Sequence, residues 1–273
     1  AHTPTPIEHL PNLSVNIGGA VLYVKRDDCT GLALGGNKAR QLEYYIGDSL
    51  SQNADTILIT GAVQSNFVRA AAAAAARYGL TCHIQLEERV KSAVALYQNS
   101  GDVLLNHLLG TIIHSYPDGE DEAGADLSVH EIADVLRAQG SRPYVIPLAP
   151  GHPPLGALGY VVAAQEIVSQ LTAMDRAVSE IVVASGSGLT HAGLLFGPRM
   201  LGSSIRVLGI CVRRDSGAQA LRIRARCREI SELLEVQSRV TDADINLRDE
   251  FLGPGYGQLN SPTREAIKLA AHH

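Results

Sequence analysis

The sequence predicts an α/β protein built from two open parallel-sheet domains. Two observations predict this fold class. Short runs rich in β-branched residues alternate along the chain with longer helical patterns, and more than six such runs fall within 273 residues. Alternation of this kind is typical of parallel sheets covered by helices. The number of strands, set against the length, favours two α/β units over one.

Strands are expected where a β-branched and apolar run is short and bounded by turn residues. The runs are AVLYVK (20–25), TILIT (56–60), 82–86, 111–114, 144–147, EIVVA (180–184) and 205–211. The apolar centre of TILIT is typical of a strand that is covered on both faces.

Helices are expected between these strands, where the apolar pattern lengthens. Their ranges are 37–50, 65–77, 103–109, 129–139, 155–171, 190–201 and 217–235. The alanine run inside 65–77 lies between Arg69 and Arg77, which indicates a close-packed helix.

The chain organisation favours two domains joined by short crossings. No internal repeat of fixed period and no low-complexity linker is visible. The stretch PLAPGHPP (147–154) is rich in proline and glycine and is the best hinge candidate. We expect a smaller α/β domain over 46–147 and a larger domain made of 1–45 and 148–273.

Composition and charge exclude several classes of function. The net charge is −5 without a basic run, so nucleic-acid binding is not expected, because phosphate neutralisation needs clustered Lys and Arg. The sequence contains no stretch of about 18 apolar residues, so no membrane span is predicted. The four cysteines form no CxxC pair, which argues against a zinc site and a disulfide framework. With no visible signal peptide, a reduced cytoplasmic protein without metal is expected.

Ligands of open α/β sheets bind at the carboxyl ends of strands, where three loops are notable. The first loop is GGNK, residues 35–38, before a helix. Its glycines let the backbone approach a ligand closely. Lys38 opposes the helix dipole, which helps to lower its amine pKa, and Schiff-base chemistry requires a neutral amine. Taken alone, such a lysine is usually solvated. The nearby Asp27–Asp28 pair is expected to fix this loop.

The second loop is SGSGLTHAG, residues 185–193, directly after EIVVA. A Gly/Ser-rich turn before a helix N-terminus presents backbone N–H groups to a phosphate. The loop is not the GxGxxG dinucleotide fingerprint, because His191 stands where the last glycine would be. The plain alternative is an ordinary tight turn.

The third loop is GAVQSN, residues 61–66, which supplies neutral donors and acceptors. Its plain alternative is a helix N-cap by Ser65 or Asn66. A phosphate nest, a lysine and a neutral polar loop at strand ends together fit pyridoxal 5'-phosphate (PLP). This cofactor needs a phosphate anchor, an amine for its aldehyde and a polar contact to its ring oxygen.

Several segments resemble the D-cysteine desulfhydrase / 1-aminocyclopropane-1-carboxylate deaminase family. They are KRDDCTGLALGGNKARQLE (25–43), GAVQSN, RPYVIP (142–147), GALGY (156–160) and the loop 184–193. This family belongs to the tryptophan-synthase-β-like fold type II of PLP enzymes, and L-cysteate sulfo-lyase is a close relative. The resemblance covers nearly the whole chain. It implies a PLP site in the cleft between the two domains, a small amino-acid substrate and a homodimer.

The resemblance implies roles for the matching residues. Lys38 would bind PLP as a Schiff base and move the α-proton of the substrate. Asn66 would hydrogen-bond the ring hydroxyl, and Ser65 would bind the substrate carboxylate, with Phe67 beside it. Tyr256 would lie against the ring or the substrate, with a surface turn tyrosine as the plain alternative. The phosphate would be held by Gly186, Ser187, Gly188, Leu189 and Thr190.

This sequence departs from the family pattern at several places, among them Phe67, Leu189, the segment after RPYVIP and the C-terminal end. Phe67 stands where relatives usually have His or a polar residue, and Leu189 stands where glycine is usual. Relatives also continue past the final helix into a segment resembling DPVYTGK, which carries a tyrosine and a hydroxyl residue near the pyridine nitrogen. Nothing of that segment follows His273, so the C-terminal part of the larger domain is expected to be incomplete.

The resulting hypothesis is PLP-dependent α,β-elimination on a small β-substituted amino acid such as D-cysteine. The products would be pyruvate, ammonia and the leaving group. Alternatives with the same cofactor are 1-aminocyclopropane-1-carboxylate deaminase, L-cysteate sulfo-lyase and an amino-acid racemase. An alternative of a different class is a non-catalytic PLP-binding homologue, which Phe67 and the missing segment would favour. A nucleotide or sugar-phosphate enzyme is disfavoured, because the Walker and GxGxxG patterns are lacking.

Overall fold

The computed structural model describes residues 1–90 and 94–273 and confirms the α/β fold class. The strands are β1 (Ile7–His9), β2 (Tyr23–Lys25), β3 (Thr56–Ala62), β4 (Thr81–Glu87), β5 (Ile112–Tyr116), β6 (Pro143–Ile146), β7 (Glu180–Ser185), β8 (Arg206–Cys211) and β9 (Asn246–Arg248). The helices are α1 (Pro11–Ile17), α2 (Lys38–Ser51), α3 (Asn66–Tyr78), α4 (Ala95–Asn99), α5 (Asp102–Leu108), α6 (Glu122–Ala138), α7 (Leu155–Ala173), α8 (Leu189–Met200), α9 (Ser216–Leu233) and α10 (Ser261–His272).

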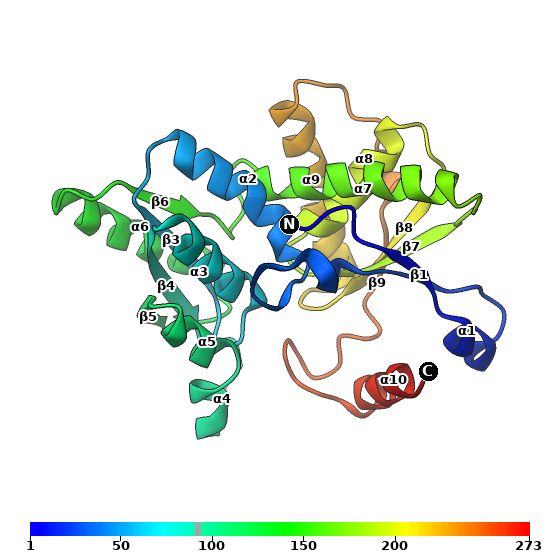
Figure 1. Cartoon of the computed structure of the whole chain (residues 1–273), viewed down its shortest axis with the longest axis horizontal. Coiled ribbons are helices and arrows are strands. Elements are labelled where there is room, and N and C mark those ends of the chain that lie inside the picture. Colours follow the sequence, from blue (N-terminus) through cyan, green and yellow to red (C-terminus); the bar gives the residue numbers. More distant parts are fainter. Residues whose placement is uncertain (91–93) are drawn as a thin grey trace.

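Two parallel sheets organise the described residues. One has the strand order β5-β4-β3-β6 and the other the order β7-β8-β9, while β1 and β2 form a separate antiparallel pair. Figure 1 shows the sheet of β3–β6 and the sheet of β7–β9 on opposite sides of the molecule, with α2 above the first and α7 above the second. Their strands end toward the same central region, which is where ligands bind in open α/β sheets.

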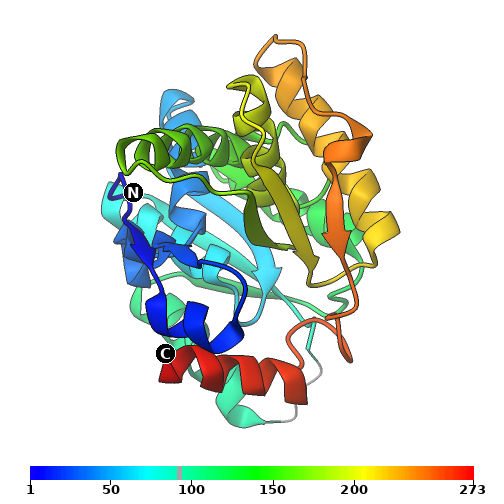
Figure 2. The same cartoon turned by 90° about the vertical axis from the view of Figure 1, so that its right-hand side faces the viewer.

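Each sheet carries its own hydrophobic core. Residues of α2 and α3 pack with β3 and β4 on one face of the larger sheet, and α6 covers the other face. Residues of α7, α8 and α9 pack with β7 and β8. The view in Figure 2 shows α10 and α1 below these layers, and α10 has no buried residue. Within residues 1–90 and 94–273, no helix has the length and apolar character needed to cross a membrane.

The predicted strands and helices are present, with shifted ends. The strand expected over 20–25 shortens to β2, and the helix expected over 129–139 begins earlier, at Glu122. The earlier start follows from Asp121, whose side chain caps α6 by accepting a hydrogen bond from the Gly124 N–H at 2.9 Å. The elements β1, α1, α4, β9 and α10 have no counterpart in the sequence expectations, since they are short or lie on the surface.

A buried ion cluster joins α2 to α7 and to the segment that contains Asp27. The guanidinium of Arg40, 2% exposed, donates hydrogen bonds to Asp27 and Glu166 at 2.9–3.0 Å. The Tyr160 hydroxyl donates to Asp27 at 2.6 Å. The Asp27 carbonyl also accepts the N–H of Gly36, in the loop before Lys38, at 2.9 Å. The bonds of Asp27 match the role expected for the Asp27–Asp28 pair, which is to fix the lysine loop, whereas the Asp28 carboxylate pairs with Arg26 on the surface.

Close contact between α2 and α7 depends on a glycine. A Cβ atom placed on Gly159 would lie 2.2 Å from the carbonyl oxygen of Arg40. Only glycine lets the two helix backbones approach this closely, because any side chain would overlap the neighbouring main chain. The GALGY segment therefore fixes the distance between α7 and the helix that begins with Lys38.

The substitution Arg40→Gln is expected to lower the free energy of unfolding by about 3–5 kcal/mol, because it leaves the Asp27 carboxylate without its cation and leaves Glu166 with Lys25 alone. Urea unfolding followed by circular dichroism measures the change. The matched control is Arg26→Gln, whose exposed pairs with Asp28 and Glu8 should contribute nothing measurable. Equal stability of the wild type and the Arg40→Gln variant would contradict this account.

Candidate active site

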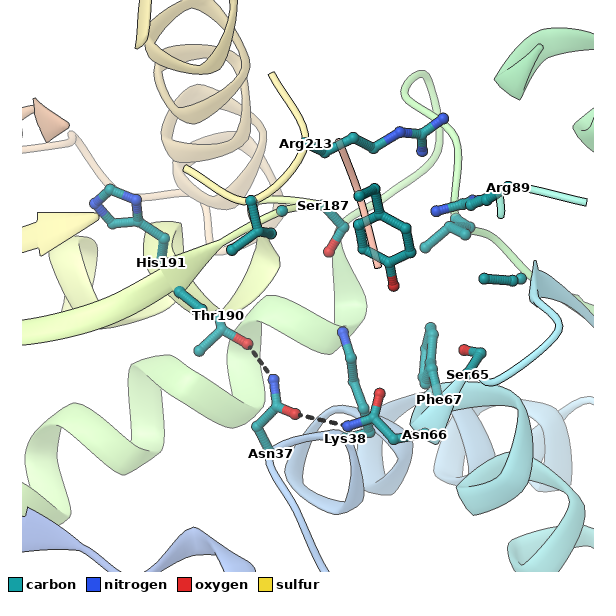
Figure 3. Close-up of a pocket in the computed structure, with 18 of the residues that line it drawn as sticks. Asn37, Lys38, Ser65, Asn66, Phe67, Arg89, Ser187, Thr190, His191 and Arg213 are labelled. Atoms are coloured by element: carbon teal, nitrogen blue, oxygen red, sulfur yellow. Dashed lines mark hydrogen bonds between the residues drawn. The ribbon is translucent and has the colours of Figure 1, made fainter. Parts of the chain in front are cut away.

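A cleft of about 240 Å³ lies where the carboxyl ends of the two sheets meet (Figure 3). Its walls combine the loops after β3 and β7 with the start of α2, three segments far apart in the sequence. The predicted site residues that line it are Lys38, Ser65, Asn66, Phe67, Gly186, Ser187, Gly188, Thr190 and Tyr256. Leu189 is the exception. Its side chain is 2% exposed and packs into the core around α8, so its backbone N–H is the part left to face a ligand.

Lys38 is the first residue of α2 and rises into the cleft (Figure 3). Its amine is enclosed and lies 4.8 Å from the centre of the Phe67 ring, and it donates to the side-chain oxygen of Gln41 at 3.3 Å. Burial lowers the pKa of Lys38 from 10.5 to about 8. The sequence predicts that the helix dipole lowers the pKa of Lys38. In the structure this pKa is indeed lowered, but the cause is burial of the amine. An appreciable neutral fraction of the amine is therefore present near neutral pH.

The loop after β3 places Ser65, Asn66 and Phe67 at the start of α3. The Ser65 hydroxyl caps α3 by accepting the N–H of Val68 at 3.4 Å, so the plain N-cap alternative also holds. The Asn66 amide makes a long hydrogen bond of 3.4 Å to Asn37, which leaves it weakly committed. Phe67 is buried beside the lysine, and its ring makes that part of the wall apolar.

The loop after β7 forms the N-terminus of α8. Gly188 occupies the N-cap with φ +94°, and no side chain in the described part of the chain caps this end. The first backbone N–H groups of a helix have no acceptor within that helix, so here they can serve an anion. The Thr190 hydroxyl accepts hydrogen bonds from Asn37 at 3.0 Å and from Gln41 at 2.8 Å. Both lone pairs are then used, and the hydroxyl proton can be donated to a ligand.

These residues fit pyridoxal phosphate. The uncapped end of α8, with the Thr190 hydroxyl, provides donors for a phosphate. The partly neutral amine of Lys38 provides the nucleophile for an aldehyde. The Asn66 amide provides a neutral polar group on the facing wall. Asn37 and Gln41 join the start of α2 to the start of α8 through the Thr190 hydroxyl, a role that the sequence expectations do not include.

Tyr256 lies on the cleft wall, half-buried, with the guanidinium carbon of Arg89 5.9 Å from its ring centre. Tyr256 lies in a turn, as its plain alternative expects, and its side chain also lines the cleft. Whether the ring meets the cofactor or the substrate stays a prediction.

Three charged residues of the cleft are absent from the sequence expectations: Arg89, Glu122 and Arg213. Arg213 donates to the Glu122 carboxylate at 2.6 Å and to the carbonyl of Gly119 at 2.8 Å. Arg222 donates to Glu122 at 2.6 Å, and Arg214 also donates to it. Because Arg213 follows β8, the rule that ligands meet strand ends would have identified it.

This ion cluster of Glu122, Arg213, Arg214 and Arg222, here called the clasp, links the two sheets across the cleft. Burial by itself would raise the pKa of Glu122, but Arg222, Arg214 and Arg213 outweigh it and hold that pKa below its usual value. Glu122 comes from α6, which packs on the β3–β6 sheet, and the arginines come from the β8–α9 segment. The clasp therefore helps to set the width of the cleft.

Comparison with known proteins points to the same cofactor. The family model "Pyridoxal-phosphate dependent enzyme" matches residues 1–273. The chain is 42% identical over 268 residues to a D-cysteine desulfhydrase of Klebsiella pneumoniae, covering 98% of this chain and 79% of that relative. It is 41% identical over 269 residues to a D-cysteine desulfhydrase of Salmonella typhi, with the same coverage. A crystal structure described as an ACC deaminase homologue superposes with a TM-score of 0.85 at 38% identity, covering 98% of this chain and 77% of that one.

The lowered pKa of Lys38 gives a pH prediction. Only the neutral amine attacks an aldehyde, so attachment of pyridoxal phosphate should accelerate as the pH rises through about 8 and then level off. Rapid mixing of the cofactor with cofactor-free protein, followed by visible absorption, measures the rate. The Lys38→Ala variant should give no lysine-bound absorption. A midpoint near the ordinary lysine value of 10.5 would contradict the burial argument.

The clasp gives a stability prediction. The substitution Glu122→Gln should lower the free energy of unfolding by about 3 kcal/mol, because three arginines lose their shared carboxylate. It should also raise KM, since the width of the cleft is no longer fixed. Urea unfolding and initial rates measure the two effects. The control is Glu120→Gln. The Glu120 carboxylate is 73% exposed and makes a long contact of 3.4 Å with Arg213, so this variant should change stability and KM little.

Proposed function

Because the chain belongs to the pyridoxal-phosphate dependent enzyme family, we propose that it catalyses α,β-elimination on a small β-substituted amino acid such as D-cysteine. The products are pyruvate, ammonia and the leaving group. The enzyme is thus a PLP-dependent lyase. The observation that carries this function is the enclosed Lys38 amine, with its pKa lowered to about 8, in a cleft that also contains an uncapped helix N-terminus. The relatives named D-cysteine desulfhydrase support elimination as the reaction type.

The proposed roles of the phosphate and ring contacts follow from the donors present. Backbone N–H groups of Gly186, Ser187, Gly188, Leu189 and Thr190 would hold the phosphate, together with the hydroxyl of Thr190. Lys38 would hold the cofactor through its amine, and Asn66 would donate to the ring hydroxyl. When bound, pyridoxal phosphate draws electrons from the α-carbon of the substrate and so acidifies the α-proton.

Lys38 is the proposed base. A group with a pKa of about 8 can accept the α-proton near neutral pH and can release it again. The Phe67 ring lies against this amine and makes that part of its surroundings apolar. Ser65, at the N-terminus of α3, is the proposed anchor for the substrate carboxylate, since helix N-termini favour anions. Tyr256 is proposed to pack against the cofactor ring or the substrate.

A second candidate is 1-aminocyclopropane-1-carboxylate deamination, favoured by the structural match to an ACC deaminase homologue. L-Cysteate sulfo-lyase and racemase activities would use the same lysine and cofactor contacts. A non-catalytic PLP-binding homologue is the alternative of a different class. The D-cysteine desulfhydrase relatives favour a catalytic protein over this last alternative, since the lowered pKa of Lys38 would serve cofactor attachment in both.

We also propose that the active unit is a homodimer in the cytoplasm, with domains 1–45 plus 148–273 and 46–147. The dimer rests on the family resemblance. The reducing compartment is supported by the cysteines of the described residues, which are all free thiols, with Cys82, Cys211 and Cys227 buried. The domain division is supported by the two separate sheets, although residue 45 lies inside α2.

The test is release of a 2-oxo acid by the cofactor-loaded protein, which would be pyruvate from D-cysteine, L-cysteate and β-chloroalanine, and 2-oxobutanoate from 1-aminocyclopropane-1-carboxylate. Release from D-cysteine is expected, and Lys38→Ala should reduce kcat on the order of 10³-fold or more, since it removes both cofactor attachment and the base. Release only from the cyclopropane substrate, where the same assay yields 2-oxobutanoate, would establish the second candidate. Turnover of none of the four would refute the lyase function and favour the non-catalytic homologue.

A further inference from the structure

Arg89 projects into the cleft from the end of β4. Figure 3 shows it on the wall opposite Lys38, and both residues line the cavity together with Ser65. The register of the sheet pairs Ala62 with Glu87, so Arg89 lies beside the loop that leads from β3 to Ser65. Arg89 therefore faces the region where the proposed function places the substrate.

The guanidinium of Arg89 is buried, but one of its nitrogens donates no hydrogen bond. Its side chain is 8% exposed, and its Nε donates to Glu87 at 2.8 Å. Its Nη2 lies 2.7 Å from the same Glu87 oxygen, yet at an angle that makes no hydrogen bond, and it finds no acceptor among the described residues. Glu87 thus orients the guanidinium without satisfying it. A buried donor left in this state costs free energy, which a ligand acceptor would recover.

The other charged groups of the described cleft wall are committed. Lys38 is assigned to the cofactor and the α-proton. Both terminal nitrogens of Arg213 donate to Glu122 and Gly119, and Glu122 is held by arginines. Arg89 is the cation on this wall that retains a donor for the substrate. The α-carboxylate is assigned to Ser65 and the amine to the cofactor, so the remaining polar group of a small amino acid is its β-substituent.

We propose that Arg89 binds the β-substituent of the substrate and stabilises the anion that leaves. This inference rests on the proposed elimination and names the substrate class: amino acids whose β-substituent is an anion or departs as one, such as a thiol or a sulfonate. Arg89 is then a catalytic residue of the cleft, separate from the cofactor contacts. A guanidinium suits this task because it stays charged and donates several hydrogen bonds in a plane.

The bond changes balance without an oxidant or reductant. Lys38 takes the α-hydrogen as a proton, and the electron pair of that bond forms the double bond between the α- and β-carbons. The bond from the β-carbon to sulfur breaks, and sulfur leaves with the pair as hydrosulfide or sulfite. Arg89 donates to the departing anion. Water then converts the aminoacrylate into pyruvate and ammonia.

The kinetic test compares leaving groups that need different amounts of help. In the cofactor-loaded Arg89→Gln variant, kcat/KM for D-cysteine should fall about 100-fold, the effect of removing one preorganised charged donor. For β-chloro-D-alanine it should stay within about 5-fold, because chloride leaves readily without a charged donor. Arg89→Lys should recover part of the activity on D-cysteine. An equal loss on both substrates would overturn the proposal, since Arg89 would then serve the carboxylate or the fold.

The matched control is Arg213→Gln, a second arginine of the same wall whose donors are already committed. It should lower activity on both substrates by the same factor. A leaving-group dependence in Arg213→Gln equal to that of Arg89→Gln would also overturn the proposal. Unchanged cofactor absorption and circular dichroism would show that the variants are folded.

A binding measurement tests the subsite without turnover. The probe is 3-sulfopropanoate, which carries a carboxylate and a sulfonate but no amine and so cannot react. Calorimetry on the cofactor-loaded protein should show it binding at least about tenfold more weakly to Arg89→Gln than to wild type, while butanoate is unaffected. Equal binding to both proteins would refute the anion subsite. If the wild type turned over none of the substrates, the proposed elimination would fail, but this comparison would still decide the role of Arg89.

Discussion

The buried bonds among Asp27, Arg40 and Glu166 are the constraint on which the site depends. Arg40 lies two residues after Lys38 on the same helix, so fixing its guanidinium fixes the helical turn that presents the amine. A buried ion cluster is a costly way to stabilise a fold, and apolar residues often do as well. What it supplies here is orientation, because the planar guanidinium bonds two carboxylates from separate segments at once.

Precise placement of Lys38 matters because burial of its amine is what lowers its pKa. Burial lowers the pKa of the Lys38 amine, so this pKa depends on the cleft walls that enclose the amine. Phe67, which in the sequence is a departure that favours a non-catalytic protein, is in the structure a buried part of the wall beside this amine, with its ring centre 4.8 Å from the nitrogen.

The sequence predicted those parts of the fold and site that are encoded within a few residues. The lysine loop, the strands 56–60 and 180–184 and the glycine turn at Gly188 each carry a local signal, and they meet because strand ends meet. The start of α6 and the clasp at Glu122 are different. The partners of Glu122 lie about 90–100 residues away in the sequence, so no local pattern announces them.

Arg89 shows why such residues escape sequence reasoning and why they decide specificity. In the sequence it is one basic residue after an acidic pair, typical of a solvated turn. In the structure Glu87 is 1% exposed and turns the guanidinium toward the cleft, where a donor is left without a partner. The cofactor contacts supply chemistry shared by many PLP enzymes, so discrimination between substrates must come from the remaining wall. A buried donor is well suited to that task, because a substrate lacking an acceptor leaves it unpaired and is rejected.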